Sequence, residues 1–287
     1  MKCNIRGIEI NYEVLGEGRP ILCIHGYGED LEMMKGCIEP LSSGLVNYKR
    51  IYIDLPGMGK TKVTSQVNNA DSMVEILEEF VAKTIGNESF LIASQSYGGY
   101  LTLGLLLKIS DKIDGVFLLC PCIIAPNQLR TLPSKMIILQ EESFCVEDKN
   151  NQDKNNIDKN NREYFLNYAV RATSEVYDRY KKEILPGLVL GDQKFLEEYQ
   201  KNGYALSFIE RLDNFVYAKP ACILTGRQDH CVGYKDAFDI LKVFPRGTFS
   251  ILDLAGHNLQ IENKELFESH FIDWINRVEI HSKVNSS

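Results

Sequence analysis

A serine between a predicted strand and a predicted helix is the first candidate for chemistry. It lies in Ser94-Gln-Ser96-Tyr-Gly98-Gly99, between the apolar run 89–93 and a second apolar run that begins at Tyr100. A nucleophile elbow needs this context, because its serine occupies a strained turn and its neighbours two positions away must be small. Here those neighbours are Ser94, in place of the more usual glycine, and Gly98. Because small-x-Ser-x-Gly is common by chance, the stretch alone also fits an ordinary strand-to-helix turn.

Two later residues could complete a proton relay with Ser96. Asp229 and His257 each follow a predicted strand, and the chain order is serine, acid, histidine. A serine hydroxyl becomes a good nucleophile when an imidazole takes its proton, and a carboxylate holds that imidazole in the required tautomer. Asp253 is the alternative acid. We favour Asp229, because it follows a strand one strand–helix unit before the histidine.

The chain has five histidines, and the other four are assigned to places outside the relay. We predict that His25 is a structural turn residue and that His230 is a loop neighbour of the acid. His270 lies on the apolar stripe of the last predicted helix, and His281 lies in the exposed tail. His257 is therefore the predicted general base.

A tetrahedral intermediate also needs N–H donors that are already in place around its oxyanion. The backbone N–H of Tyr97, directly after the candidate nucleophile, is one predicted donor. The other is the N–H of Tyr27, in the turn His25-Gly26-Tyr27-Gly28. We predict that the residues His25, Gly26, Gly28 and Gly98 support the loops that carry these donors.

Buried strands and amphipathic helices alternate along the chain and would position these residues. Residues 2–14 predict an edge hairpin, and further strands are predicted at 20–24, 49–53, 89–93, 115–119, 221–224 and 249–252. Helices are predicted within 29–45, from a cap at Asp71 to Gly86, after Tyr100, over 234–243 and after a cap at Asn263. This alternation predicts an α/β fold with a mostly parallel, doubly wound sheet. Ligands bind at the carboxyl edge of such sheets, where the candidate residues lie.

An insertion interrupts this pattern. Residues 128–213 show many helix signals and few strand signals, so we predict a helical cap (lid) inserted into a core of residues 1–127 and 214–287. Within the cap, Arg162–Lys182 is predicted as one amphipathic helix, and Asp192 as the N-cap of another. Three Asp-Lys-Asn-Asn repeats in 148–161 predict a solvated loop or a frayed helix edge. Most cap aromatics should pack helices, and a minority should line a substrate pocket.

Composition limits the partners and the compartment. The net charge of −7 argues against nucleic acid or an anionic membrane surface as a partner. No segment approaches the ~18 apolar residues of a membrane span. The eight cysteines form no Cys-x-x-Cys pair, so we expect reduced thiols, no bound metal and a cytoplasmic location. No cofactor is predicted, and a monomer is the default with a homodimer left open.

Five motifs, in this order and spacing, resemble the capped α/β-hydrolases, a family of esterases, lactonases, C–C bond hydrolases and proline-iminopeptidase-like enzymes. The motifs are His25-Gly26-Tyr-Gly28, Asp54-Leu-Pro-Gly57-Met-Gly59, Ser94-Gln-Ser96-Tyr-Gly98-Gly99, Gly226-Arg-Gln-Asp229 and Ala255-Gly256-His257. The resemblance covers nearly the whole chain outside the predicted cap and implies the α/β-hydrolase fold.

The resemblance also implies a function. We expect a cofactor-independent serine hydrolase that cleaves an ester or another activated acyl bond of a small, largely apolar substrate through an acyl-enzyme on Ser96. Two alternatives stay open. One is a C–C bond hydrolase or an aminopeptidase-like enzyme of the same fold. The other is a receptor that binds its ligand without turnover, because fold alone does not determine function.

Overall fold

The computed structural model describes residues 1–145 and 156–285. Its centre is an eight-stranded sheet in the order β1-β2-β4-β3-β5-β6-β9-β10. The six strands from β4 to β10 in this order run parallel, whereas β2 pairs antiparallel with both β1 and β4. The strands are β1 Lys2–Ile5, β2 Ile8–Leu15, β3 Arg19–Ile24, β4 Tyr48–Ile53, β5 Phe90–Gln95, β6 Ile113–Leu119, β9 Ala221–Gly226 and β10 Gly247–Leu252. The predicted edge hairpin and mostly parallel sheet are therefore confirmed.

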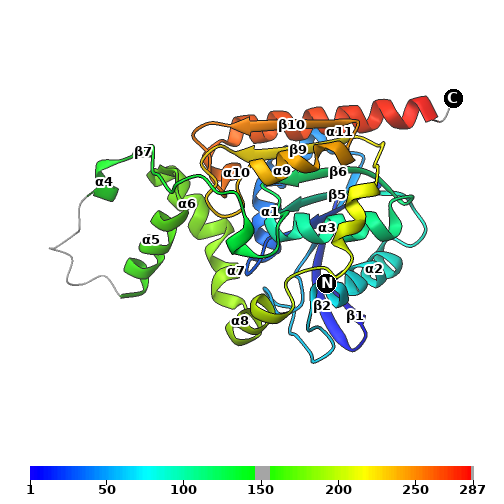
Figure 1. The fold of residues 1–287 in the computed structure, drawn as a ribbon, viewed down its shortest axis with the longest axis horizontal. Coiled ribbons are helices and arrows are strands. Elements are labelled where there is room, and N and C mark those ends of the chain that lie inside the picture. The colour runs from blue at the N-terminus through cyan, green and yellow to red at the C-terminus, as the bar shows by residue number, and fades with distance from the viewer. Residues whose placement is uncertain (146–155, 286–287) are drawn as a thin grey trace.

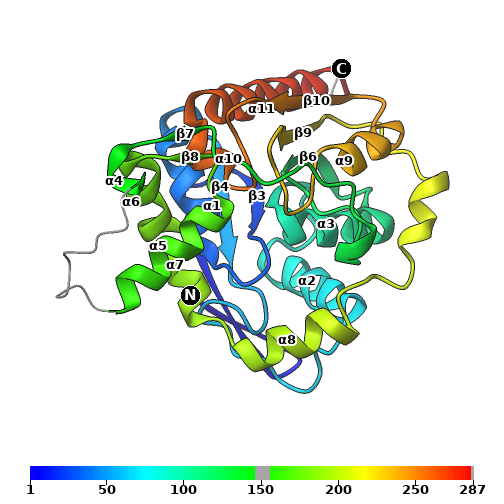
Figure 2. The same cartoon turned by 60° about the vertical axis from the view of Figure 1, so that its left-hand side comes forward.

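Helices cover both faces of the sheet (Figures 1 and 2). Helices α1 and α11 lie on one face, and α2, α3 and α9 lie on the other (Figure 2). The helical elements outside the segment between β6 and β9 are α1 Leu31–Ile38, η1 Glu39–Gly44, α2 Ala70–Thr84, α3 Ser96–Ile109, α9 Lys235–Asp239, η4 Ile240–Val243, α10 Leu259–Glu262 and α11 Lys264–Asn285. The sheet is thus doubly wound, as the alternation of strands and helices predicts.

The central strands are buried along their whole length. Every residue of β5 and of β9 is buried, because helices cover both faces of the sheet at these positions. A strand buried on both sides reads as a continuous apolar run rather than an alternating pattern, which is why these strands were recognisable in the sequence. Both end at the edge where Ser96 and Asp229 follow.

The start of α2 differs from the prediction. Its N-cap is Asn69, whose side chain accepts the N–H of Ser72 in a capping box, and not Asp71. Asp71 lies in the first turn of the helix and accepts the N–H of Ser207 instead. Asn and Asp cap about equally well, so the sequence did not separate these two positions. The predicted left-handed end at Gly86 is confirmed by its φ of +79°.

The segment between β6 and β9 is mostly helical and lies outside the main sheet (Figure 1). Its described elements are η2 Asn127–Leu129, β7 Leu139–Gln140, α4 Glu142–Cys145, α5 Asn156–Tyr168, β8 Arg171–Ala172, α6 Ser174–Glu183, α7 Leu185–Leu190, α8 Gln193–Asn202 and η3 Ile209–Asn214. Asp192 caps α8, as predicted, by accepting the N–H of Phe195 at 3.1 Å. The division into a core and a 128–213 cap stays a prediction.

Two expectations within this segment change. The single helix predicted over Arg162–Lys182 is wrong, because α5 ends at Tyr168 and α6 begins at Ser174, where Thr173 caps it. Strand β8 occupies the gap and pairs with β7. Of the repeat region 148–161, residues 156–161 belong to α5, and the rest lies outside the described residues. Among the helices of the described chain, none is long and apolar enough to cross a bilayer.

Candidate active site

Ser96 occupies a strained backbone position at the junction of β5 and α3. Its φ of +51° lies in the left-handed region, which is costly for a residue with a side chain. Gly98 permits the turn, because a Cβ atom there would lie 2.5 Å from the His25 carbonyl oxygen and 2.6 Å from that of Ile24. Ser94 is fully buried, and its hydroxyl pairs with that of Thr102 at 2.9 Å. A serine is therefore accommodated where a glycine is more usual.

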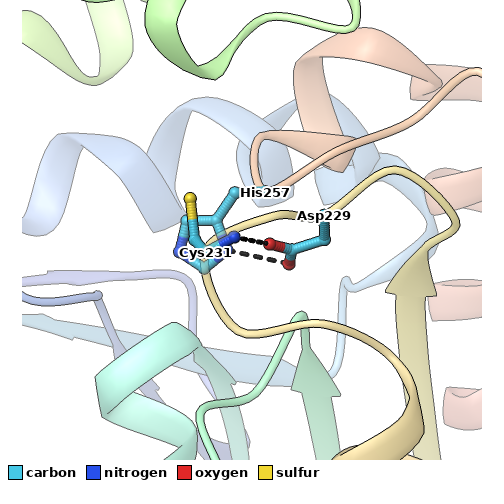
Figure 3. Close-up of side chains that lie close together, drawn as sticks. All are labelled: Asp229, Cys231 and His257. Carbon is cyan, nitrogen blue, oxygen red and sulfur yellow. Dashed lines mark hydrogen bonds and ion pairs between the residues drawn. The ribbon is translucent and has the colours of Figure 1, made fainter. Parts of the chain in front are cut away.

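Ser96, His257 and Asp229 form a continuous hydrogen-bonded chain. His257 Nε2 lies 2.9 Å from Ser96 Oγ, and His257 Nδ1 lies 2.9 Å from Asp229 Oδ2. Figure 3 shows the imidazole and the carboxylate facing each other. The other oxygen of Asp229 accepts the backbone N–H groups of Cys231 at 2.8 Å and Val232 at 3.1 Å. The carboxylate is thus fixed on one side by the turn and directed at the imidazole on the other.

The two ionisable members of this chain shift each other's pKa. Burial opposes ionisation of Asp229, but the charge and hydrogen bond of His257, with the two turn N–H groups, lower the pKa of the carboxyl. Burial likewise opposes protonation of His257, yet the charge and hydrogen bond of Asp229 raise the pKa of the imidazole. An ionised Asp229 therefore favours Nδ1–H on the ring and leaves Nε2 free to accept the Ser96 proton.

The predicted oxyanion residues lie next to Ser96. Tyr97 is the second residue of α3, which has no side-chain N-cap, so its N–H is one of the helix's unsatisfied first donors. The Tyr27 ring packs edge-on against the Tyr97 ring, with 5.8 Å between centroids. The phenol of Tyr97 pairs with that of Tyr199 at 2.8 Å. The segment between β6 and β9 therefore contacts the residue that follows the nucleophile.

His25 connects two loops rather than facing Ser96. It is fully buried, with Nδ1 2.7 Å from the Gly26 carbonyl oxygen, while Nε2 accepts the N–H of Leu55 at 3.0 Å. Burial lowers the pKa of this ring, so it stays neutral and keeps both bonds. Gly28 has a φ of +77°. His25 and Gly28 thus shape the turn that carries Tyr27.

A cavity of about 660 Å³ opens over Ser96 and His257. A second cavity of about 430 Å³ shares Tyr27, Tyr164, Tyr180 and Leu188 with it. The larger cavity is lined by residues of the loops after β3, β5, β9 and β10 and by residues from 127–204. His230 also lines it and stacks on Tyr168, with 5.9 Å between ring centroids. The walls of the larger cavity mix aromatic and polar side chains and are more polar than a largely apolar substrate would require.

Three buried polar residues around this site were not predicted from the sequence. Glu29 and Gln95 line the cavity beside Ser96. Glu262 accepts the N–H groups of Gly256 and Val170, each at 2.6 Å, and so joins the His257 loop to the segment between β6 and β9. Gln95 lies inside the elbow motif, and Glu29 follows the His25–Gly28 turn directly, but a sequence does not tell which way such side chains point.

Asp253, the alternative acid, is exposed at the end of β10 and accepts the side-chain N–H of Gln228 at 2.7 Å.

Cys231 lies beside the His257 ring (Figure 3). Ligand atoms of Asp229, Cys231 and His257 lie within 4.8 Å of one another. Asp229 already binds His257 and two N–H groups, and burial raises the pKa of the Cys231 thiol, which keeps its proton. These donors therefore suit a proton relay better than a metal ion.

Comparison with known proteins gives the family. The family model of the alpha/beta hydrolase fold matches residues 19–264. A solved structure of an alpha/beta superfamily hydrolase from Oenococcus oeni PSU-1 is 33% identical, covers 94% of this chain and 96% of its own, and superposes with a TM-score of 0.84. The chain belongs to the α/β-hydrolase fold family.

Two further relatives indicate how widely the family's activities vary. A 2-hydroxy-6-oxo-6-(2'-aminophenyl)hexa-2,4-dienoic acid hydrolase of Metapseudomonas resinovorans is 22% identical over 96% of this chain and 90% of that protein. A thermophilic esterase from Thermogutta terrifontis is 20% identical, covers 96% of this chain and 97% of its own, and has a TM-score of 0.64. The latter likeness shows a shared fold only.

Proposed function

We propose that the protein is a cofactor-independent serine hydrolase that cleaves an ester or another activated acyl bond of a small substrate. The observation that carries this proposal is the hydrogen-bonded chain Ser96–His257–Asp229 at the floor of the cavity. The mixed lining favours a substrate with both apolar and polar groups over the largely apolar one expected from the sequence. We also propose that residues 128–213 act as the cap over this cavity.

The proposed reaction has two halves. Ser96 Oγ attacks the carbonyl carbon while His257 Nε2 takes its proton, and the N–H groups of Tyr97 and Tyr27 receive the oxyanion. The intermediate collapses, His257 protonates the leaving group, and an acyl-enzyme remains on Ser96. Water then attacks the acyl carbon while His257 takes one of its protons. The second tetrahedral intermediate collapses, the bond to Ser96 Oγ breaks, His257 returns the proton to that oxygen, and the acid product leaves. Asp229 holds the tautomer of His257 throughout.

A fluorophosphonate probe tests this proposal. Intact mass should show one adduct on the parent protein and none on Ser96→Ala, because the probe reacts with an activated serine. A p-nitrophenyl ester series of rising chain length should then give multiple turnovers in the parent alone. Full turnover by Ser96→Ala would refute the mechanism. A single adduct without turnover of any ester would favour the ligand-binding receptor.

A second candidate is C–C bond hydrolysis of a vinylogous diketone. Its support is the similarity to the Metapseudomonas resinovorans hydrolase over most of both chains. The compound in that relative's name, 2-hydroxy-6-oxo-6-(2'-aminophenyl)hexa-2,4-dienoic acid, tested beside the ester series, distinguishes the two. Turnover of that compound with little ester cleavage would favour the C–C hydrolase, whereas the reverse would favour the esterase.

A further inference from the structure

Glu29 brings a second buried carboxyl group to the cavity that contains Ser96 and His257. It lies in the loop between β3 and α1 and is only 6% exposed. Its Oε2 accepts the Gly26 N–H at 3.0 Å. In the described parts of the chain, no lysine, arginine or histidine forms an ion pair with it. A buried carboxyl group usually has a cation partner, so this one requires an explanation.

Gln95 places an acceptor without a partner in the same region. Its side chain is fully buried, and Nε2 lies 3.3 Å from His257 Nε2. The amide nitrogen of Gln95 and the Ser96 hydroxyl thus share the single lone pair of His257 Nε2. Its Oε1 is then left buried with no hydrogen-bond partner among the described residues. A buried acceptor without a donor is uncommon in a folded protein.

Gly26 brings these two acceptors together next to the nucleophile. A Cβ atom on Gly26 would lie 2.1 Å from Gln95 Oε1, 2.7 Å from Glu29 Oε2 and 3.1 Å from Ser96 Cβ. The carboxyl, the amide oxygen and Ser96 therefore surround one backbone position. All three residues also line the same cavity.

The chemistry of this arrangement selects a donor. Two oxygens lie in the wall of the cavity beside Ser96, and no cation among the described residues pairs with either, so a group with N–H or O–H bonds is attracted and a carboxylate is repelled. Burial is the main reason that the pKa of Glu29 rises to about 7, and the nearby positive charge of His257 and the Gly26 N–H only partly offset it. A bound ammonium would stabilise the ionised form of Glu29.

We propose that Glu29 and Gln95 form a subsite beside Ser96 that binds an ammonium or hydroxyl group carried by the substrate close to its scissile carbonyl. This inference rests on the proposed hydrolase function and narrows its substrate class. It differs from a purely structural role for Glu29, in which the carboxyl group would only hold the Gly26 turn. A structural role would affect all substrates equally, whereas a subsite affects the preference among them.

Matched esters test the preference. We would measure kcat/KM for p-nitrophenyl esters of butyrate, 3-hydroxybutyrate and 3-aminobutyrate with the full chain, Glu29→Gln and Gln95→Leu. The parent should prefer the donor-bearing esters over butyrate by tenfold or more. Glu29→Gln should lose most of the preference for the amino ester, and Gln95→Leu should weaken the preference for both. Fluorophosphonate labelling of each variant reports whether Ser96 remains activated.

A control and a second readout keep the outcomes distinct. Glu197→Gln makes the same chemical change at an exposed residue that lines the neighbouring cavity, and it should leave the preference intact. Thermal shift with n-butylammonium against n-butyrate needs no turnover, and only the cation should stabilise the parent more than Glu29→Gln. If that shift occurs but no ester is cleaved, the subsite stands and the hydrolase proposal fails. No ester preference in the parent, or an equal loss on all esters in Glu29→Gln, would overturn the subsite.

Discussion

The loops after β9 and β3 each bring one buried carboxyl group to the same histidine, with opposite results. Asp229 accepts two turn N–H groups and pairs with His257 at 2.9 Å, and its pKa falls. Glu29 accepts one N–H group and forms no ion pair with any described residue, and its pKa rises to about 7. The difference shows that the number of donors and the contact with the imidazole, more than burial, decide the charge of each group. One carboxyl is suited to orient a base and the other to meet a ligand.

The largest effect should follow from removing the charge of Asp229. Asp229→Asn keeps the side-chain shape but no longer favours the Nδ1–H tautomer of His257. We expect kcat to fall by about 10³- to 10⁴-fold. Steady-state kinetics on the best ester checks this, with circular dichroism as the folding control. A loss below tenfold would remove Asp229 from the relay.

Removing the charge of Glu29 should change the pH dependence of stability. Its folded pKa of about 7 exceeds its ordinary value of 4.5, so the folded state holds the proton more tightly. Stability is therefore lost as pH rises from about 4.5 to 7, and Glu29→Gln should abolish that loss. We compare the free energy of unfolding of Glu29→Gln with that of the parent. Relative to the parent, the variant should be more stable at pH 8 than at pH 5 by roughly 1–3 kcal/mol.

Urea unfolding of the parent and of Glu29→Gln at both pH values measures this difference. The pKa of neighbouring Asp30 is also raised, to about 6, mainly by burial. Asp30 is present in both proteins, so its contribution cancels in the comparison. If the free energy of unfolding changed equally in both proteins between the two pH values, ionisation of Glu29 would not destabilise the folded state.

The acid limb of the pH profile should move when either carboxyl group is neutralised. Activity needs neutral His257, whose pKa is raised chiefly by Asp229 against the effect of burial, with a smaller contribution from Glu29. The rate of fluorophosphonate labelling should therefore fall as pH drops through that pKa. Asp229→Asn should shift the limb to lower pH by about one unit or more. Glu29→Gln should shift it in the same direction by less, and a shift to higher pH would contradict the assignment.

The smallest effect is expected at Asp253, the other acid next to the His257 loop. It is exposed, and it binds Gln228 instead of the imidazole. Asp253→Asn should retain kcat/KM within about twofold, because a surface substitution away from the site has little effect on stability and leaves the catalytic contacts in place. The same ester assay used for Asp229→Asn provides the comparison. A loss as large as that of Asp229→Asn would reverse the choice of acid.

Local sequence signals account for the elements of the core and for the order of its candidate residues. Buried parallel strands are continuous apolar runs, so β5 and β9 could be recognised without neighbours. Small residues around Ser96 indicated a strained turn, which the φ of +51° reproduces. The break between α5 and α6 was missed because the apolar periodicity continues across Arg171–Ala172 while the strand pairing there depends on β7.

The sequence by itself therefore determined the α/β alternation, the elbow at Ser96 and the positions of Asp229 and His257 after their strands. Only the tertiary structure decided what surrounds them. Glu29 and Gln95 are far apart along the chain, and their burial and unfilled hydrogen-bonding capacity arise where Gly26 lets the two loops meet. A side chain's pKa and its missing partners depend on groups brought together by folding, and a linear pattern does not record those contacts.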